Sequence, residues 1–323
     1  MMIKFVEDFD KFLVKAIDDL NDMFVVFDYN LVSIEFLSRV LSSLRSFHGE
    51  FTCLLPKLRL PARDKWLEAY MDESSRLWEA ARLLKKAVSN FEDGETLGDD
   101  LVSSLLLRHP VLDPERSLQI KRNIFDYKWT LDVIENGNEM WIRTNLKKLS
   151  LRFTINVRGR SKCNGFYEIL HYMKNATSLL LRILVTGLVY SCPKTIRLLR
   201  CLDSEADPRP RGLIGPSFMV SATRLRERVA QDIMGLSGIA VLEFQQLRMA
   251  VEKVEREVEM DTDSEVIKVD EDKVERLRDC FVTLKCGVES IVEQLDDLFD
   301  EIIQGRKMIM DLCTREEDLE EEE

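Results

Sequence analysis

Histidine and cysteine are the side chains with which this chain could ligate a metal or build a nucleophile–base pair, and both are sparse. The histidines are His48, His109 and His171, far apart in the sequence and without a second ligand at a metal-binding spacing. The seven cysteines form no CxxC pair; they are Cys53, Cys163, Cys192, Cys201, Cys280, Cys286 and Cys313. An odd, scattered set is typical of reduced thiols in a cytosolic protein. We therefore predict neither a metal centre nor a catalytic triad, and we interpret each histidine as structural or exposed.

Two other patterns could in principle hold phosphate or act as acid and base. The glycine-containing stretch at 212–216, GLIGP, lacks the lysine and the spacing of a phosphate-binding loop. Adjacent carboxylates such as Asp18-Asp19 and Asp296-Asp297 lie in amphipathic segments, where they usually form a solvated face. The chain also has no GxGxxG turn and no GxSxG elbow. These features predict a non-enzymatic protein without a cofactor.

Charge is distributed unevenly along this acidic chain. Residues 141–200 contain twelve basic residues and one acidic residue, Glu168. This window therefore has a net charge of +11, whereas the whole chain has −12. The window leads into an apolar segment and not into the interleaved aromatic platform of a single-strand binder, so we predict no nucleic-acid partner. An anionic membrane surface or an acidic protein segment fits the basic residues better.

The most apolar segment, residues 176–192, reads ATSLLLRILVTGLVYSC and follows the basic block at 143–162. Its centre, our candidate membrane or partner segment, comprises Leu179, Leu180, Leu181, Arg182, Ile183, Leu184 and Val185. A spanning helix needs about 20 mostly apolar residues, and a central arginine costs about 2.5 to 3.5 kcal/mol on insertion. We therefore favour a helix buried in a bundle, with Arg182 reaching its edge, and keep membrane insertion or surface attachment as the alternative.

The elements that must position these residues are expected to be helices, because glycine (13) and proline (8) are scarce in 323 residues. Apolar residues at helical spacing predict helices at 1–30, 37–51, 62–90 and 220–260. The second and third of these look like an antiparallel hairpin. We expect a short helix at 100–108 within an otherwise irregular stretch, and core positions at Leu118, Ile124, Leu131, Ile134 and Ile142, with an interruption at 136–138.

Together these segments predict an all-α fold, an elongated bundle of long antiparallel helices. The expected regions are an N-terminal helical hairpin region at 1–90, a loop at 91–114, a central basic and apolar helical region at 115–202, a linker at 203–216, a C-terminal helical hairpin at 217–314 and an acidic tail at 315–323.

The last helix carries the strongest periodicity of the chain. A heptad seam, with steps of three and four residues, comprises Val274, Leu277, Phe281, Leu284, Val288, Ile291, Leu295, Leu298 and Ile302. The seam could pair with another chain as a coiled coil or pack within the bundle. We favour the second use, because the apolar stripe from Leu247 to Val258 supplies an antiparallel partner.

Three stretches resemble plant BYPASS-like proteins: FLSRVLSSLRSFHGEFTCLLPKLRLP followed by DKWLEAYMDESSRLWEA, the central GFYEILHYMKNATSLLLRILVTGLVY, and QLDDLFDEIIQGRKMIMDLCT. The first contains the aspartate-lysine-tryptophan start and the turn into the next apolar stripe, here Asp64, Lys65, Trp66, Tyr70, Asp72 and Ser74. The chain departs from relatives in lacking a serine-rich opening, and its 203–216 linker and acidic tail look particular to it.

The resemblance implies a regulator of plant root and shoot development that restrains a mobile root-derived signal, with no catalytic residues. A related branch is linked to the exocyst in polarised secretion, and members are described as membrane-associated through the central apolar segment. Residues 1–10 lack the order of a secretory signal, so we expect a cytoplasmic protein that is not secreted, with membrane association through 176–192 and 143–162 as an open alternative. The expected partners are proteins bound through helical faces, an exocyst subunit among the candidates.

Overall fold

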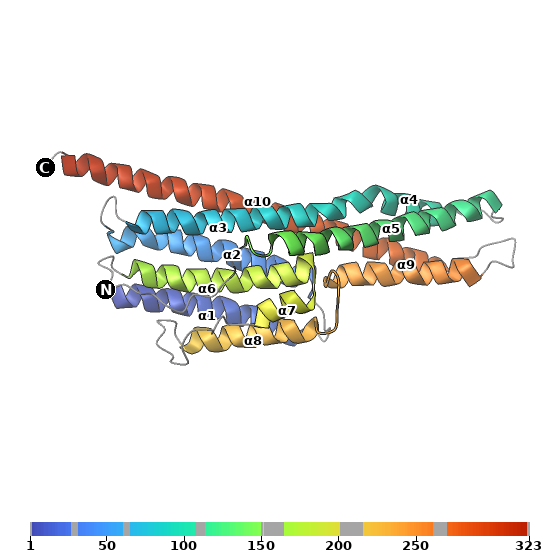
Figure 1. Ribbon diagram of the computed structural model, residues 1–323, viewed down its shortest axis with the longest axis horizontal. Helices are drawn as coiled ribbons and strands as arrows, with labels where there is room; N and C mark the ends of the chain where they lie inside the picture. The colour runs from blue at the N-terminus through green and yellow to red at the C-terminus, as the bar shows by residue number, and fades with distance from the viewer. Residues whose placement is uncertain are drawn as a thin grey trace.

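The computed structural model describes residues 2–26, 32–60, 65–106, 114–149, 151, 165–200, 216–260 and 270–321. These residues form helices joined by short turns, and the described part of the chain contains no β-strand, only one isolated bridge between Ser191 and Gly238. The prediction of an all-α elongated bundle is confirmed, and Figure 1 shows the helices aligned along one long axis.

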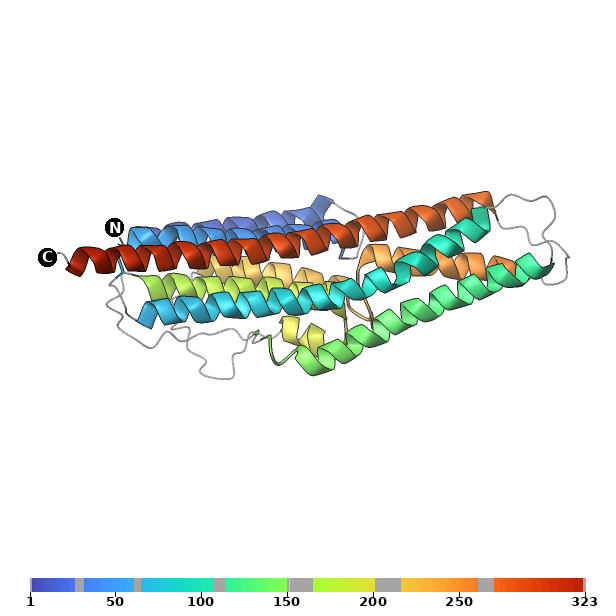
Figure 2. The ribbon, with the colours of Figure 1, turned by 90° about the horizontal axis from the view of Figure 1, so that it is seen from above.

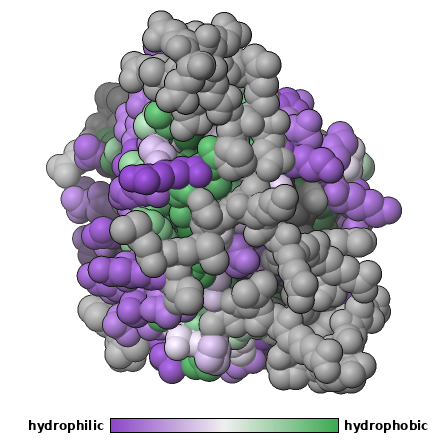
Figure 3. Space-filling view, turned by 90° about the vertical axis from the view of Figure 1, so that its left-hand side faces the viewer, coloured by the Kyte–Doolittle hydropathy of each residue, from purple (hydrophilic) through white to green (hydrophobic). Residues whose placement is uncertain are grey.

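The helices are α1 (Met2–Val26), α2 (Ile34–Leu54), α3 (Lys65–Val88), α4 (Glu95–Leu106), α5 (Pro114–Asn145), α6 (Phe166–Leu184), α7 (Pro193–Arg200), α8 (Pro216–Asp232), α9 (Leu242–Met260) and α10 (Glu271–Glu321). Short 3₁₀ segments at Leu55–Leu58 and Ser89–Gly94 follow α2 and α3, and a π-helical turn at Val185–Val189 ends α6. Seen from the end of the rod near the N-terminus, the described surface is largely hydrophilic, with hydrophobic residues recessed between the helices (Figure 3).

One half of the rod is a four-helix arrangement of α2, α3, α6 and α10, with α1 and α8 packed along its side. The helices α2 and α3 run antiparallel, as predicted, but they occupy diagonal corners, because α10 and α6 each pack against both of them. The diagonal is closed by aromatic side chains, with the rings of Phe51 and Tyr70 6.0 Å apart. The predicted simple hairpin is therefore wrong in its packing.

The other half of the rod consists of α4, α5, α9 and the first part of α10, each helix contacting two neighbours around a square. The helix α10 belongs to both halves, and its 51 residues correspond to about 77 Å of helix. Figure 2 shows α10 running along the whole molecule, with α5 forming the outer edge of the second half.

The predicted heptad seam lies inside the molecule. All of its residues are buried, from Val274 to Ile302. Early seam residues face α9 and α4, and later ones face α2 and α3. The predicted C-terminal hairpin of α9 and α10 is confirmed, and the stripe of Leu247, Val251, Val254 and Val258 on α9 is buried as well. Contacts from Arg45 to Asp297 and from Ile34 to Gly287 show that α10 also runs parallel to α2.

Two sets of hydrogen bonds near the middle of the rod join its halves: they connect the first turn of α2 and Val32 just before it to the first turn of α9. The N-cap of α2 is Ser33, whose side chain accepts a hydrogen bond from the Phe36 amide at 3.2 Å. The Glu243 carboxylate at the start of α9 accepts from the Ile34 amide at 3.0 and 3.1 Å, and the Leu242 amide donates to the Val32 carbonyl at 3.0 Å. The first turns of α2 and α9 are thus fixed to one another.

The short helix predicted at 100–108 is confirmed over its described part, as far as Leu106, but it starts earlier than predicted, because α4 begins at Glu95; the loop predicted before residue 100 is therefore wrong. Glycine misled the prediction. Gly98 lies in α4 facing Phe281, and a Cβ at this position would come within 2.2 Å of the ring. The glycine therefore permits close helix packing and does not end a helix.

The interruption predicted at 136–138 is also absent, because α5 passes through it. Asn138 is buried and bonded on both sides: its amide donates to the Val189 carbonyl at 3.1 Å, and its carbonyl accepts from Asn90 at 2.9 Å. The asparagine thus joins α5 to two neighbouring segments and does not initiate a turn.

The regions predicted after residue 202 differ from the structure in where their helices begin and end. The predicted helix at 220–260 is two helices: α8 packs on α1, whereas α9 packs on α10, so the hairpin begins at Leu242 and not at 217. Of the predicted linker at 203–216, only Pro216, the first residue of α8, is described. The backbone of the predicted acidic tail continues α10 as far as Glu321.

Candidate functional site

The side chains with potential for acid–base or metal chemistry are dispersed. His48 on α2 is buried beside α3 and α10, with its Nδ1 3.5 Å from Glu301 Oε1. This neighbour holds the pKa of the Glu301 carboxyl below its usual range, against the opposing effect of burial. His171 lies on α6 next to Asn175, and His109 lies outside the described residues. Within the described ranges, no three His, Cys, Asp or Glu side chains gather in a way that could hold a metal ion.

No disulfide joins the cysteines of the described part, which are Cys53, Cys192, Cys280, Cys286 and Cys313. Cys163 and Cys201 lie outside the described residues. Burial raises the pKa of the Cys280 thiol, the reverse of what an activated nucleophile requires.

The carboxylate pair at 296–297 connects helices. Asp296 lies 2.5 Å from Lys85 Nζ of α3, and Asp297 pairs with Arg45 of α2, all four side chains being partly exposed. These are surface ion pairs between packed helices, which agrees with the predicted solvated face.

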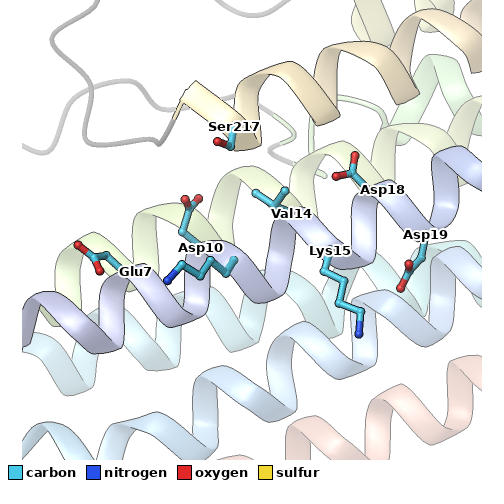
Figure 4. Close-up of a pocket in the computed structure, with 8 residues that line it drawn as sticks. Glu7, Asp10, Val14, Lys15, Asp18, Asp19 and Ser217 are labelled. Carbon is cyan, nitrogen blue, oxygen red and sulfur yellow. The ribbon is translucent and has the colours of Figure 1, made fainter.

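A groove of about 460 Å³ lies between α1 and the start of α8, and four carboxylates and two lysines are among the residues that line it. Figure 4 shows Asp10 and Asp18 directed toward α8, while Lys15 and Asp19 point away from it. Burial raises the pKa of the Asp10 carboxyl. The polar groups do not converge on one point, so the groove has no defined place for a ligand.

The apolar segment at 176–192 forms the core of the first half of the rod. All seven of its central residues, from Leu179 to Val185, are buried. Arg182 does not reach the edge of the bundle as predicted, because it is fully buried. Its Nε donates to the Leu151 carbonyl at 2.8 Å and its Nη1 to the Leu198 carbonyl at 2.9 Å. Among the described helices, none combines the length and apolar character needed to cross a bilayer.

Arg182 also organises part of the basic window. By bonding both carbonyls, it holds the chain after α5 against α7. Exposed cations lie near each bonded carbonyl in the sequence: Lys147 and Lys148 before Leu151, and Lys194, Arg197 and Arg200 on α7. We call these five residues the cationic cluster. The part of the basic block at 152–162 lies outside the described residues.

The feature that the sequence analysis missed is the outer face of α5. Its large apolar side chains are exposed: Leu118, Phe125, Trp129, Val133 and Met140. Phe125 is 66%, Trp129 64% and Met140 60% exposed, values unusual for aromatic and large aliphatic residues of a packed helix. We call these five residues the α5 stripe.

The inner face of α5 has its own set of apolar residues, which are buried against α4 and α9: Ile120, Ile124, Tyr127, Leu131 and Ile134. Leu118, predicted as a core residue, was therefore assigned to the wrong face. The available signal was the presence of two apolar series on one helix, since a single core-facing helix needs only one.

Comparison with known proteins adds no assignment to this geometry, since no family model, no curated protein and no solved structure matches the chain.

Proposed function

We propose that this protein is a non-enzymatic helical interaction protein, of the BYPASS-like kind, that docks protein partners on the α5 stripe in the control of plant root and shoot development. The observation that carries the proposal is the α5 stripe itself. Exposed apolar residues that recur along one helix face are typical of a surface that another helix covers. The resemblance of three stretches of the chain to BYPASS-like proteins supports the developmental part of the proposal.

The composition of the α5 stripe suits a docking surface. Trp129 and Phe125 are one helical turn apart, so a partner can cover both rings at once. Full burial of a Phe side chain is worth about 1.5 to 3 kcal/mol, and aromatic anchors of this kind dominate many interfaces. Arg122 lies exposed within the α5 stripe, between Leu118 and Phe125, and Arg143 lies exposed just beyond Met140; both can bond polar groups of a partner.

Photo-crosslinking in living plant cells tests the docking surface directly. A photoreactive residue replaces Phe125 in the full chain, and a second protein carries it at Met249 on α9, which is 48% exposed. We expect covalent protein adducts from position 125 that are absent from position 249. Equal adduct yields at the two positions would remove the support that the α5 stripe gives to the proposal.

Complementation tests the developmental role. Plants lacking the protein receive the wild-type chain, the double variant Phe125→Ser/Trp129→Glu, or the control variant Met249→Glu. We expect the wild type and the control to restore shoot growth and the double variant to fail, although it accumulates to the same level. Restored shoot growth in plants that carry the double variant would show that the developmental role does not need the α5 stripe.

A membrane-associated adaptor in exocyst-linked secretion is the second proposal, and the cationic cluster is the observation that favours it. Each Lys or Arg near an anionic membrane contributes about 1 kcal/mol of attraction. Attachment would then use exposed basic residues, since the segment 176–192 is occupied with core packing. Flotation with phosphatidylserine vesicles should be lost in Lys147→Glu/Lys148→Glu and in high salt. Equal flotation with neutral vesicles would contradict this second proposal.

A further inference from the structure

We infer that the partner on the α5 stripe is a second copy of this chain, with α5 pairing antiparallel to α5 of the other copy across a two-fold axis at Trp129. The inference rests on the proposed docking role of the α5 stripe and names its occupant. In a two-fold symmetric pair, one surface must be complementary to itself. The α5 stripe meets this condition in its spacing, its side-chain sizes and the charges at its ends.

The spacing of the α5 stripe is symmetric about Trp129. Phe125 and Val133 lie four residues before and after it, and Leu118 and Met140 lie eleven residues before and after it. In an antiparallel pair centred on Trp129, Leu118 therefore faces the partner's Met140, and Phe125 faces the partner's Val133. All five residues stay within about 40° of one helix face, because steps of four and eleven residues nearly complete whole turns.

The side-chain sizes also complement each other across this axis. The larger ring of Phe125 meets the smaller Val133 of the other copy, which leaves space beside the axis for the two Trp129 indoles. Large and small residues facing one another allow the side chains of two helices to interdigitate.

The charges at the two ends of α5 extend the symmetry. Glu115 and Arg143 lie fourteen residues before and after Trp129, and both are exposed, Arg143 also pairing with Glu139 one turn earlier on its own helix. The pairing places each Glu115 opposite an Arg143 of the other copy, so the two opposite charges meet twice in one dimer. Between them, Arg122 faces the partner's Asn136, a contact without like-charge repulsion.

Two acidic residues beside the α5 stripe also face each other across the axis, Asp126 and the partner's Asp132. Asp132 lies 3.3 Å from Arg248 of α9, whose positive charge reduces this repulsion. A helix pair of this length gives an interface at the small end of the specific range, so the dimer should dissociate on dilution.

Sedimentation equilibrium of the purified full chain tests the inference. We expect a reversible monomer–dimer equilibrium, with Trp129→Glu raising the dissociation constant about tenfold or more because each dimer loses both indoles. The matched control Met249→Glu, an exposed apolar residue of α9, should dimerise as the wild type does. Circular dichroism and urea unfolding of the uncharged variant Trp129→Thr show whether a chain that has lost the indole still folds. They therefore separate loss of pairing from loss of folding.

Charge reversal tests the antiparallel register. Glu115→Arg alone and Arg143→Glu alone should each weaken the dimer, since each places like charges together at both ends. The double variant Glu115→Arg/Arg143→Glu should restore it, because the two charges exchange places. A parallel pair or a dimer formed elsewhere would show no restoration.

A wild-type chain that stays monomeric up to about 100 μM, or a Trp129→Glu chain that still dimerises, would overturn the inference. The crosslinking experiment separates this result from failure of the proposed function. Adducts from position 125 to another protein, with a monomeric pure chain, would leave the docking role standing and remove self-association. The absence of position-specific adducts would remove the docking role itself.

Discussion

Arg182 stands at the centre of the most apolar segment, and the groups around it explain why a cation is placed there. The guanidinium donates hydrogen bonds to two backbone carbonyls, that of Leu151 after α5 and that of Leu198 in the last turn of α7. A buried carbonyl without a donor costs about 1 to 3 kcal/mol, and arginine is suited to satisfying two of them at once, because its donors point in several fixed directions.

Arg182→Met should therefore lower the free energy of unfolding by about 3 kcal/mol, although methionine fits an apolar core better than arginine does. Arg182→Lys should recover only part of the loss, since one ammonium group cannot reproduce the planar fork. Urea denaturation of the full chain measures both, with Lys174→Met on the same helix as the control. A stability change in Arg182→Met no larger than in the control would show that the two carbonyl contacts contribute little.

His171 should make the free energy of unfolding depend on pH. Burial, with a smaller effect from Lys174, lowers the pKa of the imidazole below its usual value. The unfolded chain therefore takes up a proton at higher pH than the folded chain does. The stability contribution is complete above the unfolded pKa of about 6.5 and is lost as the pH falls from there through the lower folded pKa.

We expect the urea concentration at the unfolding midpoint to decrease as the pH is lowered from about 7.5 to about 5.5. His171→Gln should make this decrease smaller, because glutamine keeps a polar group near Asn175 without titrating. Unfolding midpoints measured at half-unit pH steps provide the comparison. Identical profiles for the wild type and His171→Gln would assign the pH dependence to other groups.

At the scale of the element, two glycines within helices have opposite consequences. In α4, Gly98 faces Phe281 so closely that a Cβ would meet the ring at 2.2 Å, whereas a Cβ at Gly137 of α5 would meet only Asn90 Nδ2, at 3.8 Å. Gly98→Ala should destabilise the protein by about 1 to 2 kcal/mol through overpacking, and Gly137→Ala should stabilise it by about 0.5 to 1 kcal/mol through helix propensity. Thermal unfolding of the two variants decides both signs, and stabilisation in each would show that Phe281 can move aside.

Helices with one apolar face were predictable from the sequence, but of the helix pairs that pack together only α9 with α10 was predicted correctly. The stripe of α10 repeats without a break from Val274 to Ile302, so periodicity predicted the apolar seam, and the stripe from Leu247 to Val258 favoured its burial within the bundle. Glycine positions misled the prediction at α4, because the same residue that ends a helix also allows two helices to approach closely. The α5 stripe escaped detection because apolar residues on both faces of α5 cancel the amphipathic signal.

At the scale of the molecule, α10 makes one body of two four-helix halves. Its contacts pass from α4 and α9 to α2 near Gly287, where a Cβ would come within 2.4 Å of Ile34. Which helices become neighbours depends on contacts between segments far apart in the chain. The parallel alignment of α2 and α10 therefore had no local signature, whereas the antiparallel hairpin of α9 and α10 had one in its two consecutive stripes.

A proline in α10, at the point where the two halves of the rod meet, should make the halves unfold separately. Glu289 is exposed on α10, so Glu289→Pro changes the backbone without removing a core side chain. The substitution should cost about 3 kcal/mol or more and split thermal unfolding into two transitions. Calorimetry of the full chain, with Glu289→Ala as the control, tests this, and one sharp transition in the proline variant would mean that the halves cooperate without a continuous α10.

The packing of α2 against α10 also has a consequence for biosynthesis. About 250 residues separate the end of α2 from Gly305, which lies beside His48 and Thr52. At 5 to 20 residues per second, the ribosome needs about 10 to 50 s to complete this interval. The part of α2 that α10 covers therefore stays uncovered during this interval, whereas α1 and α6 can cover the rest of α2 earlier, and nascent chains should depend on chaperones at this part of α2 until α10 emerges.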